Sequence, residues 1–102
     1  MPIGYHTILF SLEGRLLAFG GNSSGQLGLG HRKQRITPAQ VPWKGPQPVE
    51  VECGLLHSLV LDAEGGVWQA GDTDYHKGSL TFERVPENRG KRHLFFWQHG
   101  LE

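Results

Sequence analysis

Two stretches of the chain share one pattern of apolar and polar positions. Residues 6–20, HTILFSLEGRLLAFG, and residues 57–71, HSLVLDAEGGVWQAG, each hold an apolar run, an acidic turn containing Glu-Gly and a second apolar run that ends in glycine. Short runs rich in Leu, Ile, Val and Phe on either side of such a turn predict a β-hairpin in each stretch. A helix is disfavoured, because no segment keeps apolar residues at three-to-four spacing for about ten residues without a Gly or Pro.

Shorter apolar runs predict further strands. We expect them near residues 39–41, 48–52, 82–85 and 94–97. Turns are expected about every 8 to 12 positions, so the predicted fold class is all-β. The 15 Gly and 6 Pro among 102 residues agree with a chain that makes many tight turns.

The two hairpin stretches lie 51 residues apart and align without a gap. The same shift carries His6 onto His57 and Gly20 onto Gly71. A period near 50 residues that combines short apolar runs with glycines is typical of propeller blades. We therefore predict two repeats, residues 1–53 and residues 54–102. The second is degenerate, because DTDYHKG at residues 72–78 replaces the Asn-containing segment that follows the first hairpin.

The segments around the hairpins resemble a known repeat. GLLHSLVLDAEGGVWQAG at residues 54–71 and FGGNSSGQLGLG at residues 19–30 are similar to the repeat of the regulator of chromosome condensation family. The motif positions are His6, Gly14, Gly20, Asn22, Gly25, Gln26, Leu27, Gly28, Gly30, Gly54, His57, Gly65 and Gly71. Members of this family usually close about seven four-stranded blades into a ring. The resemblance thus implies two four-stranded antiparallel blades of such a β-propeller, with the ring completed by oligomerisation or by missing blades.

Most motif residues are expected to serve the fold. Only glycine readily tolerates a positive φ or a close backbone approach in a loop as tight as GQLGLG. The alternative, a phosphate-binding loop, lacks a following Gly-Lys-Ser/Thr and a helix N-terminus. Asn22 is expected to make hydrogen bonds within its own turn.

Two histidines at the starts of the hairpins raise the question of catalysis. His6 precedes Thr7 and His57 precedes Ser58. Neighbours on a strand point to opposite faces, so such a pair does not meet as base and nucleophile. We expect both imidazoles to bond neighbouring backbone groups near the propeller centre, and Asp62 to be solvated beside its turn. The sequence thus predicts no catalytic residue and no enzyme.

The six histidines form no zinc-finger pattern. None of their spacings matches a paired cysteine or a His pair three to five residues apart. His93 and His99 flank an aromatic run at an even separation, which is a weak pattern. We expect no metal ion and no cofactor.

Loop residues are the candidates for partner binding. Basic clusters at residues 31–35 and 89–93 lie in predicted loops, where they are either solvated or meet an acidic partner. Trp43, beside Lys44, is either an interface anchor or a ring held under its own loop. The candidate residues are Arg32, Lys33, Arg35, Trp43, Lys44, Tyr75 and His76.

Charge and composition limit the partners. Ten Lys and Arg balance ten Asp and Glu, so nucleic-acid binding by bulk electrostatics is disfavoured. The apolar runs are far shorter than the roughly 20 residues of a membrane-spanning helix, so no membrane is expected. A single cysteine, Cys53, makes no internal disulfide and favours a reducing compartment, the cytoplasm or the nucleus.

The leading functional hypothesis is a non-catalytic β-propeller repeat protein that mediates protein–protein interaction. The resemblance implies a second hypothesis, guanine-nucleotide exchange on a small GTPase, because the founding member of the family acts in this way on Ran. Two blades leave apolar faces and strand edges uncovered. We therefore also expect a homo-oligomer that closes a propeller ring.

Overall fold

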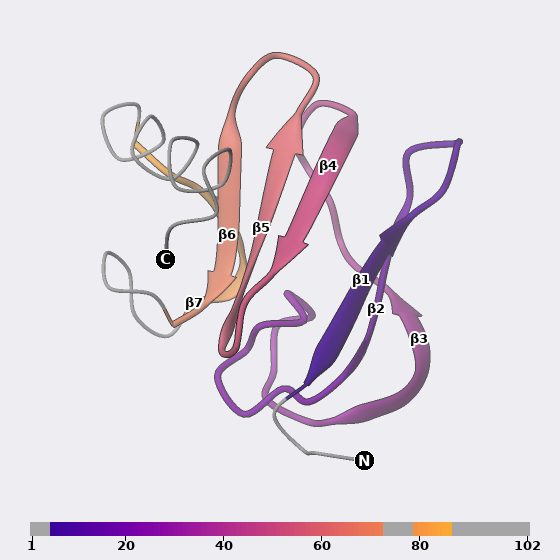
Figure 1. Ribbon diagram of the computed structural model, residues 1–102, viewed down its shortest axis with the longest axis vertical. Helices are drawn as coiled ribbons and strands as arrows, with labels where there is room; N and C mark the ends of the chain where they lie inside the picture. The colour runs from indigo at the N-terminus through magenta and orange to yellow at the C-terminus, as the bar shows by residue number, and fades with distance from the viewer. Residues whose placement is uncertain (1–4, 73–78, 87–102) are drawn as a thin grey trace.

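The computed structural model describes residues 5–72 and 79–86, and every named element in them is a β-strand (Figure 1). The strands are β1 (His6–Phe10), β2 (Leu16–Gly20), β3 (Arg35–Gln40), β4 (Pro48–Cys53), β5 (His57–Asp62), β6 (Val67–Gly71) and β7 (Ser79–Arg84). The all-β prediction is confirmed. The strand expected near residues 94–97 lies outside the described residues.

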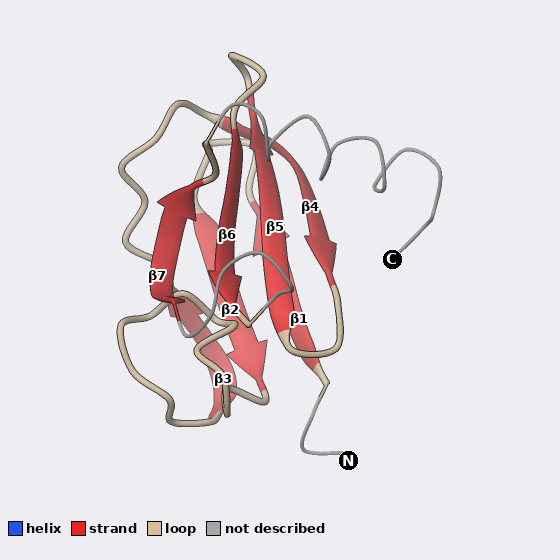
Figure 2. Ribbon diagram, turned by 90° about the vertical axis from the view of Figure 1, so that its left-hand side faces the viewer, coloured by secondary structure: helices blue, strands red, loops and turns tan. Residues whose placement is uncertain are grey.

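The seven strands form two antiparallel sheets (Figure 2). The first has the order β1-β2-β3 and the second the order β4-β5-β6-β7. The prediction of four strands in each sheet is right for the second and wrong for the first, which has three strands in the described part of the chain. The reason is the pairing of β4, which follows the first hairpin in sequence but pairs with β5. Sequence repeats and sheets are therefore offset by one strand.

The two hairpins have the same register, as their sequence alignment predicts. His6 pairs with Gly20 across β1 and β2, and His57 pairs with Gly71 across β5 and β6. Both pairs lie at the open end of their hairpin, opposite the turn, where the chain leaves the second strand. The equivalence of His6 and His57 is thus confirmed at the level of strand register.

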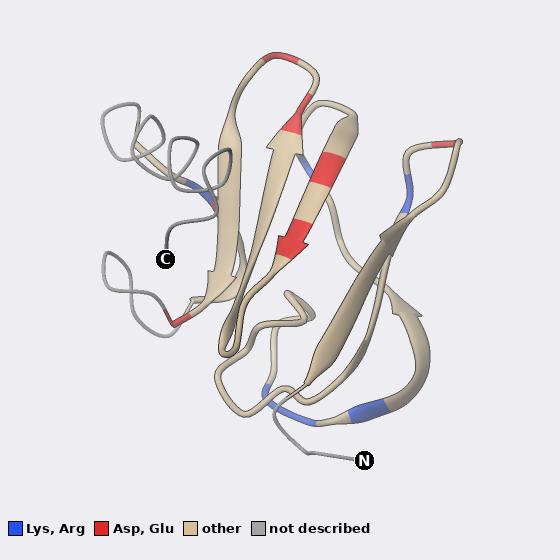
Figure 3. Ribbon diagram, viewed as in Figure 1, with Lys and Arg blue, Asp and Glu red and all other residues tan. Residues whose placement is uncertain are grey.

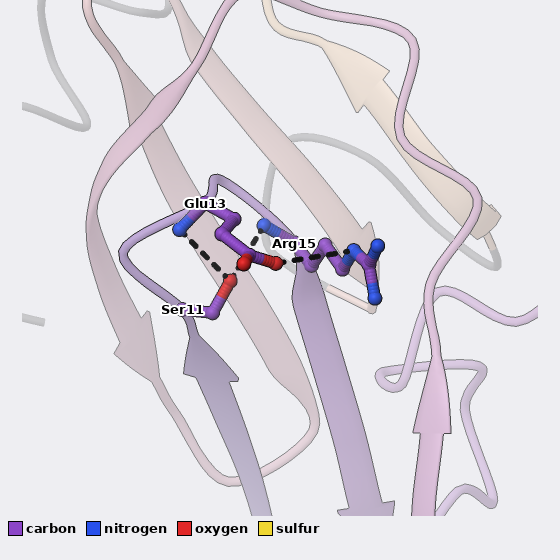
Figure 4. A network of polar contacts seen from close by, with 3 residues as sticks. All are labelled: Ser11, Glu13 and Arg15. Carbon is purple, nitrogen blue, oxygen red and sulfur yellow. Dashed lines mark hydrogen bonds and ion pairs between the residues drawn. The ribbon is translucent and has the colours of Figure 1, made fainter.

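A serine organises the turn of the first hairpin (Figure 4). The hydroxyl oxygen of Ser11 accepts hydrogen bonds from the amides of Glu13 and Arg15, both at 3.2 Å. An ion pair also joins the side chains of Glu13 and Arg15 at 3.8 Å. Since both side chains are largely exposed, this ion pair adds little to the stability of the turn.

A carboxylate takes the place of that serine in the second hairpin. Asp62 Oδ1 accepts the amides of Glu64 at 2.8 Å and of Gly66 at 2.9 Å, the same positions relative to the acceptor. Gly14 and Gly65 occupy equivalent places in the two turns, and each has a φ of 87°. Two different acceptors thus build the same turn, which explains why the hairpins align without a gap.

The main core lies between the two sheets. It is formed by Ile8, Leu16, Ala18, Leu27, Val41, Val60, Ala70 and Phe82. Successive side chains of a strand point to opposite faces, so Ile8 is 5% exposed whereas its neighbour Leu9 is 47% exposed. The outer face of the first sheet therefore presents apolar side chains to solvent. A smaller cluster of Leu59, Val67 and Val85 lies on the other face of the second sheet.

Candidate functional site

The loop after the first hairpin is held by one buried amide side chain. Asn22 Nδ2 donates to the carbonyls of His31 at 2.8 Å and Lys33 at 2.9 Å, and its Oδ1 accepts the amide of Leu27 at 3.0 Å. These bonds fold residues 22–33 into a closed turn. The bond to Leu27 agrees with the turn role predicted for Asn22, whereas His31 and Lys33 lie nine and eleven positions further along the chain.

Two glycines of this loop press against the last strand of the second sheet. Gly25 and Gly28 have φ values of +82° and +71°. A Cβ on Gly25 would lie 2.6 Å from Leu80 Cδ2, and one on Gly28 would lie 2.5 Å from the ring of Phe82. Both reasons for glycine expected from the sequence, the positive φ and the close approach, therefore act here.

The same loop fastens the first repeat to β7. Leu27 is fully buried in the core between the sheets. Leu29 forms an isolated antiparallel bridge with Thr81, and the amide of Gly30 donates to the carbonyl of Leu80 at 2.8 Å. The GQLGLG segment is thus a connector between two sheets as well as a tight loop.

A hydrogen-bond chain links the two sheets through His6. Its Nε2 lies 2.7 Å from the hydroxyl oxygen of Ser58, which in turn lies 2.6 Å from the carbonyl oxygen of Gln26. A carbonyl oxygen only accepts, so the Ser58 hydroxyl donates to Gln26 and the imidazole donates through Nε2. His6 Nδ1 is therefore the unprotonated nitrogen of the neutral ring.

Protonation of His6 is disfavoured by this setting. Burial lowers the pKa of His6, and the nearby His57 lowers it further. Nδ1 is buried and has no hydrogen-bond partner among the described residues. A backbone interaction with His57, of the kind predicted, partly opposes this lowering of the pKa. The side-chain partner of Nε2, Ser58, was not predicted. The cause is the packing of two sheets, which a pattern along one strand does not show.

The other motif residues surround the second histidine and close the hairpins. A Cβ on Gly54 would overlap the imidazole of His57, and the Gly54 amide donates to the His57 carbonyl at 2.9 Å. Gly20 and Gly71 end β2 and β6 beside His6 and His57. Their lack of a side chain lets the cross-strand backbone approach closely. These close approaches give the glycines a role in the fold.

Asp62 is buried, against the expectation that it would be solvated. It is 3% exposed, and its Oδ2 accepts the indole N–H of Trp68 at 2.8 Å in addition to the two turn amides. Burial opposes ionisation, but the hydrogen bonds from Trp68, Gly66 and Glu64 outweigh it and hold the pKa of Asp62 below its ordinary value. The signal in the sequence was the alignment of Asp62 with Ser11, another turn acceptor.

The candidate partner-binding residues do not form one surface. Arg35 pairs with Gly20 at the end of β2, so exposed Arg32 and Lys33 lie near the histidine pairings. The chain then runs along β3, and Val41 bonds Leu16 at the opposite end of β2. Figure 3 shows basic residues beside the start of β3, and both acidic and basic residues near the hairpin turns of the other end.

Trp43 lies at that other end and packs between the sheets. Its Nε1 donates to the carbonyl of Pro46 at 2.7 Å, and its ring centroid lies 4.9 Å from that of Trp68 and 5.8 Å from that of Phe82. Lys44 beside it is exposed. The geometry fits the alternative interpretation, a ring held under its own loop. Tyr75 and His76 lie outside the described residues.

Apolar residues that the sequence reasoning missed lie close to the basic ones. Tyr5 is 62% exposed, Leu55 65% and Leu56 38%. The carbonyl of Tyr5 accepts an amide just after β2, and that of Leu56 accepts one just after β6, so all three lie at the same end of the sheets. We call Tyr5, Leu55, Leu56, Arg32 and Lys33 the histidine end. In the sequence, this group of exposed apolar residues could have been found from the apolar residue directly before each histidine, Tyr5 and Leu56.

Residues 5–72 and 79–86 hold neither a metal-binding cluster nor a membrane-spanning helix. No three or more His, Cys, Asp or Glu side chains gather there in a way that could hold a metal ion. Nor does this part of the chain contain a helix long and apolar enough to cross a membrane.

Two sheets built on one repeated hairpin, locked by a glycine-rich connector, define a part of a β-propeller. The family model "Regulator of chromosome condensation (RCC1) repeat" matches residues 13–61. The chain belongs to the RCC1 repeat family. The fold agrees with the crystal structure of human WBSCR16, with a TM-score of 0.72 and 20% identity over 79% of this chain and 23% of that one.

Curated relatives match over most of this chain. It is 35% identical over 71 residues to the Xenopus laevis "Protein RCC2 homolog", which covers 69% of this chain and 14% of that protein. It is 39% identical over 69 residues to the human "Probable E3 ubiquitin-protein ligase HERC3", covering 67% and 7%. It is also 39% identical over 67 residues to the mouse "X-linked retinitis pigmentosa GTPase regulator", covering 65% and 7%. The chain thus spans a small part of each relative's length.

Proposed function

We propose that this chain is a non-catalytic β-propeller repeat protein that binds a protein partner through its histidine end. The observation that carries the proposal is the combination of exposed apolar Tyr5, Leu55 and Leu56 with exposed Arg32 and Lys33. Exposed apolar side chains that gather with a charged rim are typical of protein interfaces. An acidic protein surface with an apolar anchor is the partner that fits this chemistry.

A protein partner suits the whole chain better than a nucleic acid does. The formal net charge is zero, and the histidine end also holds an acidic residue, since the amide of Asp72 donates to the carbonyl of Leu56 (Figure 3). The basic cluster is therefore local, which favours steering of one acidic surface over general attraction to phosphate. A reducing compartment, the cytoplasm or nucleus, remains our proposal for its location.

Guanine-nucleotide exchange on a small GTPase is the second candidate. The mouse relative that is 39% identical over 67 residues carries the name of a GTPase regulator. Exchange would use the same end of the sheets to hold the GTPase. We rank it below simple binding, because one fold supports many functions and exchange needs a broad, complete propeller face.

Matched charge reversals test the binding surface. Lys33→Glu changes the histidine end, whereas Lys44→Glu makes the same change at the opposite end. Partners recovered with the unmodified chain are identified by mass spectrometry, and their affinity for each variant is then measured. We expect Lys33→Glu to lower both the affinity and its dependence on salt concentration. Leu55→Ser should lower the affinity about tenfold. Lys44→Glu should leave the affinity and its salt dependence unchanged. Equal affinities for all variants would contradict the proposal.

A nucleotide-release assay separates the two candidates. A small GTPase recovered as a partner is loaded with fluorescent GDP and mixed with the chain. Simple binding leaves the release rate unchanged. A rate that rises with the concentration of the chain, and that falls with Lys33→Glu, would support exchange instead.

A further inference from the structure

Thr37 is the only serine or threonine of the sequence that is followed by proline. Basic residues precede it at positions 32, 33 and 35. Proline-directed protein kinases act on a hydroxyl directly before proline in an extended segment. A residue before proline is itself held in an extended conformation, because the proline ring disfavours the helical one. The sequence around Thr37 therefore has the form of a kinase substrate.

The structure places Thr37 in a bulge of β3. Between the pairs Ala18–Ala39 and Gly20–Arg35, β2 has one residue and β3 has three. Thr37 is the middle one of these three, and all three are exposed. The extra residues of a bulge are left out of the ladder of hydrogen bonds. In the described part of the chain β3 is also an edge strand, so an enzyme can approach this segment.

The equivalent bulge in β7 provides a comparison. The register makes Thr81 the counterpart of Thr37. The connector loop lies against this bulge through an antiparallel bridge between Leu29 and Thr81, yet Thr81 remains exposed. A threonine hydroxyl at this position is thus accessible even where a loop lies against the strand. Phe82 follows Thr81, so the second bulge has the threonine but not the proline.

A buried hydrogen-bond donor lies next to the first bulge. The Nε atom of Arg35 is buried and has no hydrogen-bond partner among the described residues. A buried donor without an acceptor costs free energy. A phosphate on Thr37, two positions further along β3, would add three acceptor oxygens and a charge of about −1.5 to −2. Arginine and phosphate form strong, charge-assisted hydrogen bonds, so Arg35 is suited to receive this group.

We propose that Thr37 is a phosphorylation site for a proline-directed protein kinase, and that Arg35 binds the phosphate once it is attached. The Thr37 hydroxyl oxygen attacks the γ-phosphorus of ATP and forms a new P–O bond. The bond from the γ-phosphorus to the β,γ-bridging oxygen breaks, ADP leaves with that oxygen, and the kinase takes up the hydroxyl proton. The proposal does not depend on the partner of the histidine end.

Phosphate transfer tests the site. The chain is incubated with ATP and either a cyclin-dependent kinase or a mitogen-activated protein kinase, and the product is mapped by tandem mass spectrometry. With at least one of the two kinases, we expect a single phosphate, on Thr37. Thr37→Val should take up none and Pro38→Ala almost none. Thr81→Val, the matched change in the second bulge, should react like the unmodified chain. An unmodified Thr37 with both kinases, or equal incorporation in Pro38→Ala, would overturn the assignment.

Gly28→Val separates the folded chain from the unfolded chain as the substrate. Gly28 lies against Phe82 of β7, so the variant should destabilise the fold without changing β3. We expect the unfolded fraction to rise about tenfold. If the kinase acts on the bulge of the folded chain, the initial rate of phosphorylation stays the same. A rate that rises with the unfolded fraction would contradict the proposal, because the kinase would then act on a chain without β3.

The Nε–H resonance of Arg35 tests the contact with the phosphate. A stronger hydrogen bond moves the proton signal of an N–H group downfield. We expect this shift on phosphorylation of Thr37, in a signal that Arg35→Lys removes. The Nε–H of Arg15, which lies 3.8 Å from a carboxylate oxygen of Glu13 in the hairpin turn, is the internal control and should not move. An Arg35 signal that phosphorylation leaves in place would overturn the role given to Arg35.

Discussion

His6 of the first sheet donates a hydrogen bond to Ser58 of the second at 2.7 Å, and this side-chain contact spans 52 positions of sequence. Because the Ser58 hydroxyl in turn donates a hydrogen bond to the carbonyl of Gln26, one hydroxyl joins both sheets and the connector loop. The histidine and the serine of the repeat motif therefore act between neighbouring sheets. Within one repeat they are neighbours in the sequence.

Ser58→Ala tests that link. The substitution leaves the His6 Nε2–H and the Gln26 carbonyl without their partner in a buried place, so we expect a loss of about 2 kcal/mol in the free energy of unfolding. Ser23→Ala changes an exposed serine in the same loop region and should cost less than about 0.5 kcal/mol. Chemical denaturation measures both. Equal midpoints for the two variants would show that the hydrogen-bond chain contributes nothing.

Stability should depend on pH through His6. Burial, and then the charge of His57, place the pKa of His6 below its ordinary value, so the unfolded state takes up the proton first. The contribution of neutral His6 is fully present above about pH 6.5 and is lost as the pH falls through the lower, folded-state value. We expect thermal midpoints that drop between pH 7.5 and pH 5.

His6→Gln should flatten that pH dependence. His31→Gln is the control, because the imidazole of His31 lies in the loop, where its Nδ1 accepts the amide of Lys33 at 3.0 Å. The control should retain the slope of the unmodified chain. A slope unchanged by His6→Gln would assign the pH dependence to another group.

The connector glycines should be more sensitive than their neighbours. Gly28→Val combines a positive φ with a Cβ that meets the ring of Phe82, and we expect a loss of roughly 1 to 3 kcal/mol. Gly25→Val should behave similarly against Leu80. Ser23→Val in the same loop is exposed and should matter much less. Indistinguishable thermal midpoints for the three variants would refute the role given to these glycines.

Asp62 should matter more than the serine in the equivalent turn. Asp62→Ala leaves the indole N–H of Trp68 and two turn amides without an acceptor, so we expect a loss of about 2 to 3 kcal/mol, against about 1 kcal/mol for Ser11→Ala. Since the pKa of Asp62 is lowered, its stabilising contribution is present above its ordinary pKa and is lost as the pH falls through the lower folded-state value. Acid unfolding of the chain and of Asp62→Ala measures this difference.

The repeated hairpin was predictable because its information is local. The apolar runs and the turn residues of each hairpin lie within about 15 positions of sequence, and they predicted both hairpins. The 51-residue shift between the two copies predicted the equivalence of His6 and His57. The pairing of β4 with the following sheet was not predictable in this way. A strand next in sequence to two hairpins can join either one, and the choice depends on the packing of whole sheets.

The candidate site shows the same division. The exposure of Arg32 and Lys33 could be predicted from their position in a loop. The placement of Trp43 at the opposite end depends on the direction of β3. Buried Asp62 was missed because its indole partner belongs to the next strand. The exposed apolar residues before each histidine lie at one end of the molecule only because the two sheets pack with their histidine ends together, and the sequence does not show this packing.

The one-strand offset between repeat and sheet has a consequence for how such chains can be shortened or recombined. A cut at the sequence boundary between residues 53 and 54 removes β4 from the sheet in which it pairs, so the first product carries an unpaired strand and the second a sheet that lacks its first strand. A crossover in the segment between Gln40 and Pro48 leaves every strand with its neighbours. Units exchanged between Gln40 and Pro48 should therefore be interchangeable modules. Units exchanged between residues 53 and 54 each supply a strand to the sheet of the next unit, so they depend on their neighbours.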